Sequence, residues 1–196
     1  MSYKEILGII AIIIAFVSYV PYIQDVLNGK TKPHAFSWLV YSVMTGIAFF
    51  GQLAGGGGAG AWVNGLTAIV CFIIFIFGLI KGRSNIAFID WFSLTGAGVA
   101  LIFWFVTKGP LLSVILVTLI DALGYFPTFR KSYHKPHEET LITYLLSSLK
   151  YVFALFALST FSVVTVLFPL YLVLANFAFV VMVVIRKKQL RVGEAF

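Results

Sequence analysis

The sequence predicts an all-α integral membrane protein with seven transmembrane helices. Of its 196 residues, 61% are hydrophobic and only 11% are charged, and the mean hydropathy is +1.02. A soluble domain of this size would need far more charge to cover its surface. Apolar stretches of about 20 residues, the length that crosses the hydrocarbon of a bilayer, follow one another along the whole chain. Lys and Arg gather in alternate loops between these stretches.

The seven expected spans are separated by short segments that break the apolar pattern with Gly, Pro or charge, such as GKTKPH after the first span. The spans lie at 5–27, 35–54, 60–80, 85–107, 111–129, 140–160 and 163–185. The first span is too long for the apolar region of a cleaved signal peptide. The single cysteine, Cys71, lies inside the third span and allows no disulfide within the chain.

The positive charges predict the orientation of the spans. The loops after spans 1, 3 and 5 and the C-terminal tail carry Lys30, Lys32, Lys81, Arg83, Arg130, Lys131, Lys135, Arg186, Lys187, Lys188 and Arg191. The opposite side carries only Lys4 and Lys108, and Lys150 lies within a span. Because basic loops stay in the cytoplasm, we expect the N-terminus outside and the C-terminus inside, in a cell (plasma) membrane.

The chain also contains an internal repeat, which is found when the sequence is shifted by 106 residues. Tyr19 then meets Tyr125, Pro21 meets Pro127, and the first three spans superpose on the last three. Three spans that start outside end inside. Two copies with the same orientation therefore need an odd number of connecting helices between them, and one is enough. The expected organisation is therefore a 3+1+3 arrangement of parallel repeats. The repeats cover 1–83 and 110–196, which includes a basic C-terminal tail, and the linker helix covers 84–109.

The segment SYVPYIQDVLNGKTKPHAFSW, from Ser18 to Trp38, resembles the PQ-loop motif. GYFPTFRKSYHKPHEETLITY, from Gly124 to Tyr144, resembles a looser second copy. Tyr22 and Thr128 stand where the motif has a glutamine. The resemblance is to the PQ-loop and SWEET-like superfamily of sugar, cystine and related transporters, which also includes the KDEL receptor. It implies a transporter that moves a small polar solute by alternating access, with proton coupling left open. The alternative is a receptor of the KDEL-receptor type, which binds a small ligand or peptide without moving it.

The candidate site residues are polar or aromatic positions within the spans. The resemblance implies that Asn176 lines the substrate site and, less directly, that Asn64 does so. The prolines that SWEET-type transporters carry in the second helix of each repeat are missing from this sequence, and Trp38 and Tyr144 occupy roughly their places. The candidate substrate-binding residues are Asn176, Asp121, Lys150, Tyr125, Ser147, Asn64, Trp38 and Tyr144. Pro21 and Pro127 each remove a backbone hydrogen bond inside a helix, which makes them candidate hinges.

Asp121 and Lys150 are charges deep within the fifth and sixth spans. A charge at the centre of a bilayer costs roughly 2.5–3.5 kcal/mol on insertion scales, so each needs a partner or water. The two lie at nearly equal depth from the basic side on consecutive helices, and we expect them to face each other. Their equivalents in the first repeat are Ala15 and Met44, so the fold itself needs no charge at these places.

Other functional classes find little support in the sequence. Span 7 has no lysine between Ser162 and Ile185, which argues against a retinal-binding photoreceptor. The chain has no nucleophile, metal or acid–base cluster typical of an enzyme apart from the Asp121–Lys150 pair. We expect no cofactor and no metal, because His34, His134 and His137 do not have metal-site spacing. The expected partners are a small solute and the lipid bilayer, not nucleic acid, and homo-oligomerisation stays open.

Overall fold

In the computed structural model, residues 1–29, 33, 35–81, 88–107, 109–134, 136 and 141–193 are described; most of these residues are helical, and none is in a strand. Each expected span has an α-helix at its place. The elements are α1 (Tyr3–Leu27), α2 (Ala35–Ala54), the short 3-10 helix η1 (Gly58–Ala61), α3 (Trp62–Lys81), α4 (Phe88–Thr107), α5 (Leu111–His134), α6 (Leu141–Phe156) and α7 (Val163–Gly193). Lys30, Lys32, Arg83, Lys108, Lys135, His34 and His137, which the topology and metal arguments used, lie outside the described residues.

Five of the described helical segments are long and apolar enough to cross a membrane. They are Tyr3–Leu27, Ala35–Ala54, Gly58–Ile80, Leu111–His134 and Val163–Leu190. Leu94–Thr107 and Leu141–Phe156 are shorter apolar helices. The chain is therefore an all-helical protein whose helices are compatible with several passes through a membrane.

The helix ends are fixed by local hydrogen bonds. Ser2 and Glu5 form a capping box at the start of α1, in which each side chain bonds to the backbone of the other. Ser162 and Thr165 make the corresponding contacts before α7, where the Ser162 backbone N–H donates to Thr165 Oγ1 over 2.9 Å. The sixth span ends earlier than the expected residue 160, because the chain turns between Phe156 and Val163 to reach this cap.

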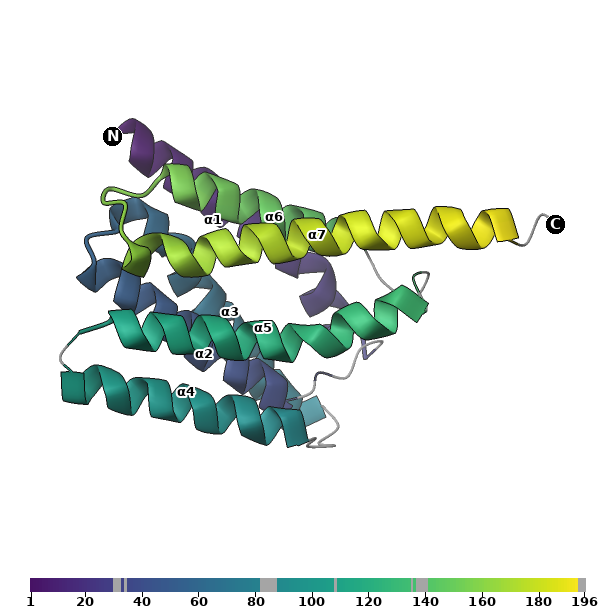
Figure 1. The fold of residues 1–196 in the computed structure, drawn as a ribbon, viewed down its shortest axis with the longest axis horizontal. Coiled ribbons are helices and arrows are strands. Elements are labelled where there is room, and N and C mark those ends of the chain that lie inside the picture. Colours follow the sequence, from purple (N-terminus) through teal and green to yellow (C-terminus); the bar gives the residue numbers. More distant parts are fainter. Residues whose placement is uncertain are drawn as a thin grey trace.

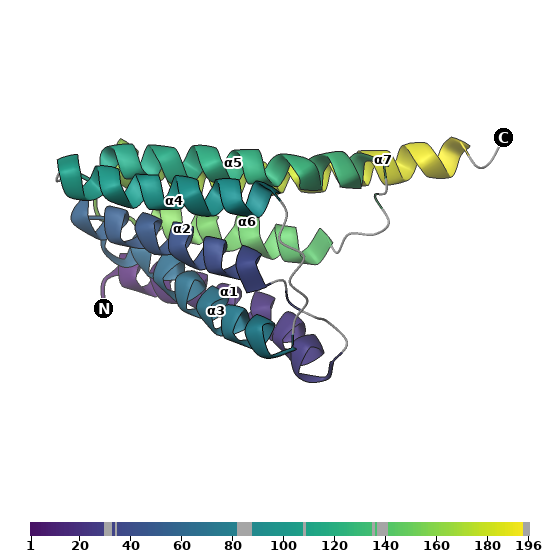
Figure 2. The same ribbon diagram turned by 90° about the horizontal axis from the view of Figure 1, so that it is seen from below.

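The order in which the helices pack differs from their order in the chain. In the first half, α3 packs against both α1 and α2, and in the second half, α7 packs against both α5 and α6. The halves meet where α1 packs against α6 and where α2 packs against α5. The remaining helix, α4, lies against α2 and α5 on one side of the bundle (Figures 1 and 2).

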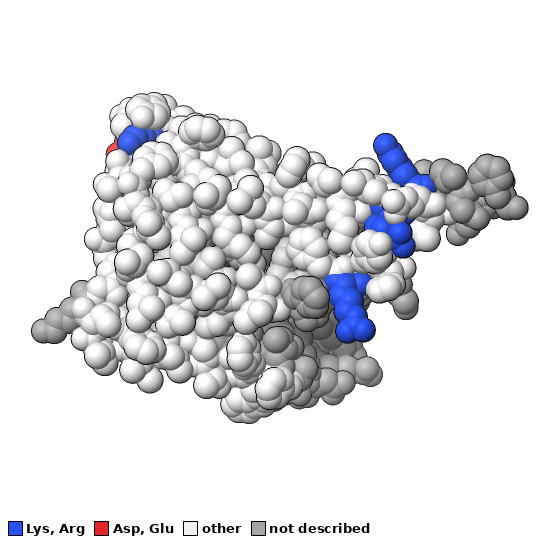
Figure 3. Space-filling view, viewed as in Figure 1, with Lys and Arg blue, Asp and Glu red and all other residues white. Residues whose placement is uncertain are grey.

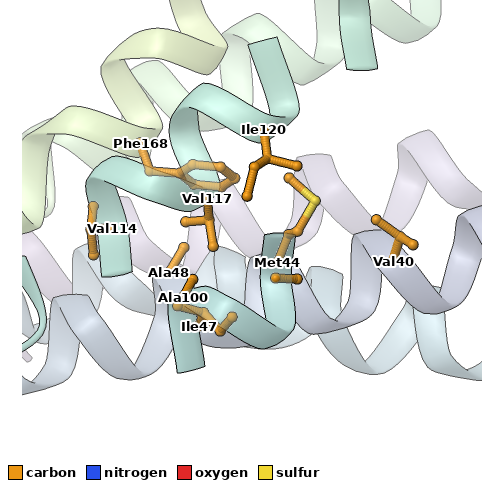
Figure 4. Packing of buried hydrophobic residues seen from close by; sticks show 10 residues of the cluster. Val40, Met44, Ile47, Ala48, Ala100, Val114, Val117, Ile120 and Phe168 are labelled. Atoms are coloured by element: carbon orange, nitrogen blue, oxygen red, sulfur yellow. The ribbon is translucent and has the colours of Figure 1, made fainter. Parts of the chain in front are cut away.

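The apolar core lies where α2, α4, α5 and α7 come together. Figure 4 shows Met44 of α2 beside Val117 and Ile120 of α5, with Phe168 of α7 closing the same cluster. Small residues such as Ala48 and Ala100 let these helices approach closely. Close packing of this kind is the main attraction between helices in an apolar solvent, where there is no hydrophobic drive to bring them together.

The described charges lie mainly at one end of the bundle. Most of the Lys and Arg side chains that are coloured in Figure 3 lie at the end where α5 and α7 finish, which we call the basic end. The opposite end holds Lys4 and Glu5 near the start of α1. At this opposite end, Gly55–Ala61 packs against residues 157–162, and the Ser159 backbone N–H donates to Gly57 O over 3.1 Å. We call it the closed end.

Candidate functional site

Lys150 is a buried cation at the place where α1, α3 and α6 meet. Its side chain is only 3% exposed. The ammonium nitrogen lies 5.0 Å from the ring centroid of Tyr19 in α1 and 5.0 Å from that of Tyr151 in α6. It has no hydrogen bond or ion pair with any described residue. The two aromatic faces are therefore its main electrostatic support, and they replace only part of its lost hydration.

One face of α3 completes this site. Asn64, Thr67 and Cys71 lie on that face, as their spacing predicts, and all three are buried. Thr67 lies next to the hydroxyls of Tyr19 and Tyr151, but Thr67 Oγ1 makes no hydrogen bond of ordinary geometry in the described part of the chain. Cys71 is a free thiol close enough to Lys150 to interact with it electrostatically. The site thus leaves the three donors of Lys150 and the hydroxyl of Thr67 without ordinary hydrogen bonds in the described part of the chain.

A second polar group lies between α5 and α7. The Tyr171 hydroxyl donates to Asp121 Oδ2 over 2.7 Å, which gives this carboxylate a strong hydrogen bond. One turn further along each helix, the Tyr125 hydroxyl donates to Asn176 Oδ1 over 3.1 Å. Asn176 Nδ2 donates to its own helix at Leu172 O over 2.7 Å. These bonds hold α5 against α7 in the interior of the bundle.

The expectation that Asp121 and Lys150 face each other is wrong. No ion pair joins them among the described residues, since Asp121 binds Tyr171 whereas Lys150 lies over Tyr19 and Tyr151. The physical reason is the packing order, in which α7 lies between α5 and α6 and occupies the place of the expected contact. The two charges belong to different junctions of the bundle.

Two aromatic pairs lie at equivalent places in the two halves. Tyr19 of α1 and Trp38 of α2 have ring centroids 6.5 Å apart, and Tyr125 of α5 and Tyr144 of α6 have centroids 6.3 Å apart. Trp38 Nε1 also donates to Tyr22 over 3.1 Å. Each pair is related to the other by the shift of 106 residues. The rings connect the first and second helix of each half, which otherwise pack against the third.

Two serines show the same correspondence. Ser42 Oγ of α2 donates to Ala68 O of α3 over 2.9 Å, and Ser148 Oγ of α6 donates to Val173 O of α7 over 3.2 Å. Ser148, rather than the candidate Ser147, makes the contact between helices. Ser147 is half-buried on the next face of α6.

Asn64 belongs to a buried hydrogen-bond chain toward the closed end. Tyr151 OH donates to Asn64 Oδ1 over 3.1 Å, Asn64 Nδ2 donates to Gln52 Oε1 over 2.7 Å, and Gln52 Nε2 donates to Thr165 O over 2.7 Å. This series of hydrogen bonds connects α6, α3, α2 and α7. Gln52 was not singled out from the sequence, although a glutamine inside an apolar span was a usable signal.

The proline positions lie inside continuous helices. α1 contains Pro21 and α5 runs through position 127, so both helices continue past the candidate hinges. Figure 1 shows α5 changing direction in its last turns. A third proline, Pro169, lies inside α7 near the closed end and was not among the sequence candidates. A proline inside a helix leaves one carbonyl without its backbone donor, which permits bending.

The two asparagines are expected to differ in their contribution to stability. Asn64→Leu removes bonds to two neighbouring helices and should lower the free energy of unfolding by about 1–3 kcal/mol. Asn176→Leu removes one bond between helices and should cost about 0.5–1.5 kcal/mol. Thermal unfolding of both variants in one detergent measures the difference. An Asn176 variant less stable than the Asn64 variant would contradict the assignment of Asn64 to the structural network.

Comparisons of the chain with models of known protein families, with curated proteins and with solved structures found no match. The class that the structure defines is therefore an all-helical protein with several helices long enough to cross a membrane. It carries a buried lysine, Lys150, and a half-buried acid–phenol pair, Asp121 and Tyr171.

Proposed function

We propose that the chain is a multi-pass membrane transporter that moves a small polar solute by alternating access. In this proposal all seven helices span the bilayer. The helices α1–α3 and α5–α7 are two parallel repeats, and α4 is the linker of a 3+1+3 arrangement that resembles the PQ-loop and SWEET-like superfamily. The equal packing order of the two halves, their equivalent aromatic pairs and the equivalent bonds of Ser42 and Ser148 support this organisation.

The observation that carries the proposal is Lys150, a cation buried between the two repeats without a hydrogen-bonding partner among the described residues. Polar and charged side chains in the interior of a membrane protein are expensive, and they mark solute or ion pathways. Lys150 comes from the second repeat, whereas Tyr19 and Thr67 come from the first. A solute bound there would touch both repeats, as alternating access between two bundles requires.

The state described here is closed at one end. The series of hydrogen bonds from Tyr151 through Asn64 and Gln52 to Thr165 connects both repeats. The hydrogen bond between Ser159 and Gly57 connects them again at the closed end. In the proposed cycle these contacts break when the closed end opens. Pro21, Pro127 and Pro169 then supply bending points within the helices of the two repeats.

Transport is tested by uptake of radiolabelled solutes into liposomes that contain the purified protein. A panel of sugars, amino acids and organic acids should include at least one solute that enters faster than into protein-free liposomes. Saturable binding of a solute without uptake would contradict transport and favour the receptor alternative.

The orientation is tested separately by cysteine labelling. Thr160 lies exposed at the closed end and Arg130 lies exposed at the basic end. In a Cys71→Ser background, Thr160→Cys should react with an impermeant maleimide on intact cells, because the positive-inside rule places the basic end in the cytoplasm. Arg130→Cys should react only after permeabilisation. The reverse pattern would overturn the orientation.

A further inference from the structure

The ammonium group of Lys150 lacks a hydrogen-bond acceptor among the described residues. The ammonium group offers three donors, and none of them meets an oxygen of a described residue. Thr67 is only 4% exposed, and its hydroxyl oxygen, Oγ1, has no hydrogen-bond partner in the described part of the chain either. We propose that the transported solute carries a carboxylate that pairs with Lys150 and Thr67. This inference rests on the transport function proposed above.

The geometry of the site favours an organic solute that carries a single negative charge. Lys150 supplies a single positive charge, and a buried cation is best balanced by a single anion that also accepts its hydrogen bonds. The rings of Tyr19 and Tyr151 flank the ammonium group and offer apolar faces to the rest of the solute. A carboxylate has two oxygens, which suffice for one bond from Lys150 and one from Thr67.

The position in the first half of the chain that corresponds to Lys150 carries no charge, so the fold does not need this cation. The shift of 106 residues relates Lys150 to Met44, which lies in the apolar cluster between α2, α5 and α7 (Figure 4). Met44 is buried among apolar side chains there. Asp121 lies at the other junction, between α5 and α7, where it accepts a hydrogen bond from Tyr171. It supplies no positive charge that would favour a second negative charge on the solute.

The test compares carboxylates with amides of the same shape. Probe pairs are L-lactate and L-lactamide, L-alanine and L-alaninamide, and phenylacetate and phenylacetamide. Each is added to the purified full chain in a nonionic detergent, at constant chloride concentration, and the unfolding temperature is recorded. A ligand that binds the folded state raises this temperature by mass action. We expect at least one carboxylate to raise it and its amide to have no effect.

Variants assign the effect to the lysine. Lys150→Met should weaken binding of that carboxylate by about tenfold or more, because a hydrogen bond to a charged group is lost. Lys150→Arg keeps the charge and should retain part of the affinity. Lys4→Met is the matched control, because Lys4 is a half-buried lysine beside a tyrosine ring, 5.9 Å from the Tyr3 centroid, and it lies at the closed end away from Lys150. It should bind the carboxylate like the unchanged protein.

Several outcomes would overturn the proposal. These are the absence of a shift with every carboxylate, an equal shift with an amide, an equal shift with chloride or sulfate alone, or unchanged binding in a folded Lys150→Met variant. If Lys150→Met does not fold, the amide comparison and Lys150→Arg decide the question. Uptake of a neutral solute without carboxylate binding would support the transport function and contradict the proposal that the solute carries a carboxylate. Carboxylate binding through Lys150 without uptake would support the carboxylate site and contradict the transport function.

Discussion

Gly60→Ala is expected to lower the free energy of unfolding by about 1–3 kcal/mol, as overpacking of a tight interior contact does. Gly60 lies in η1, where α6 approaches the backbone closely. A Cβ atom at this position would lie 2.6 Å from Ala154 O and 2.6 Å from Leu158 Cδ2. The carbonyl belongs to the backbone of α6 and cannot move aside as a flexible side chain does. The substitution therefore forces η1 and α6 apart at the closed end.

Gly46→Ala is the matched control, because the same methyl group is added to α2 where no atom lies within 4 Å. Alanine favours a helix over glycine, so this variant should be as stable as the unchanged protein or slightly more stable. Thermal unfolding of both variants in one detergent, followed by circular dichroism, measures the difference. Equal unfolding temperatures would show that η1 does not pack against α6 as described.

The positions of the helices could be predicted from the sequence because apolar length and breaking residues are local signals. α2 occupies the expected residues 35–54, and α1 and α3 differ from expectation by only a few residues. α5 and α7 run further, to His134 and Gly193. Their last turns are charged, and a count of apolar residues detects only the part of a helix that lies at hydrocarbon depth.

The candidate site could be predicted only in part, because helix order along the chain does not determine which helices touch. Asp121 and Lys150 were expected to pair on the assumption that consecutive helices are neighbours, a frequent but not universal arrangement. In each half the third helix lies between the first two, so each charge has another partner. The i, i+3, i+7 spacing of Asn64, Thr67 and Cys71 does predict their common face of α3, because periodicity within a helix is local.

The tyrosines that complete both junctions were not proposed as ligands of the charges. Tyr151 lies beside Lys150 in sequence, and Tyr19 and Tyr171 lie in other helices. In a chain with 20 Phe, 9 Tyr and 4 Trp, an aromatic residue carries little information by itself. Only the packing of the helices shows which rings point to a charge.

A disulfide across the closed end is expected to abolish transport. A Cβ atom at Gly56 would lie 3.6 Å from Thr160 Cβ, which is within the range of about 3.5–4.5 Å found in disulfides. Gly56 belongs to the turn after α2 in the first half of the chain, and Thr160 belongs to the turn before α7 in the second half. In the proposed cycle these turns separate when the closed end opens. A covalent bond between them prevents this step.

The experiment uses Gly56→Cys together with Thr160→Cys in a Cys71→Ser background, so that no other thiol is present. After oxidation, uptake into liposomes should fall to the level of protein-free liposomes, and a reducing agent should restore it. Gly56 has φ +75°, where a side chain is strained, so the unfolding temperature of the reduced double variant must show that it is folded. Each single-cysteine variant, treated with the same oxidant, should keep its uptake. If mass spectrometry finds the disulfide and uptake is undiminished, the closed end does not open during transport, and alternating access around Lys150 is excluded.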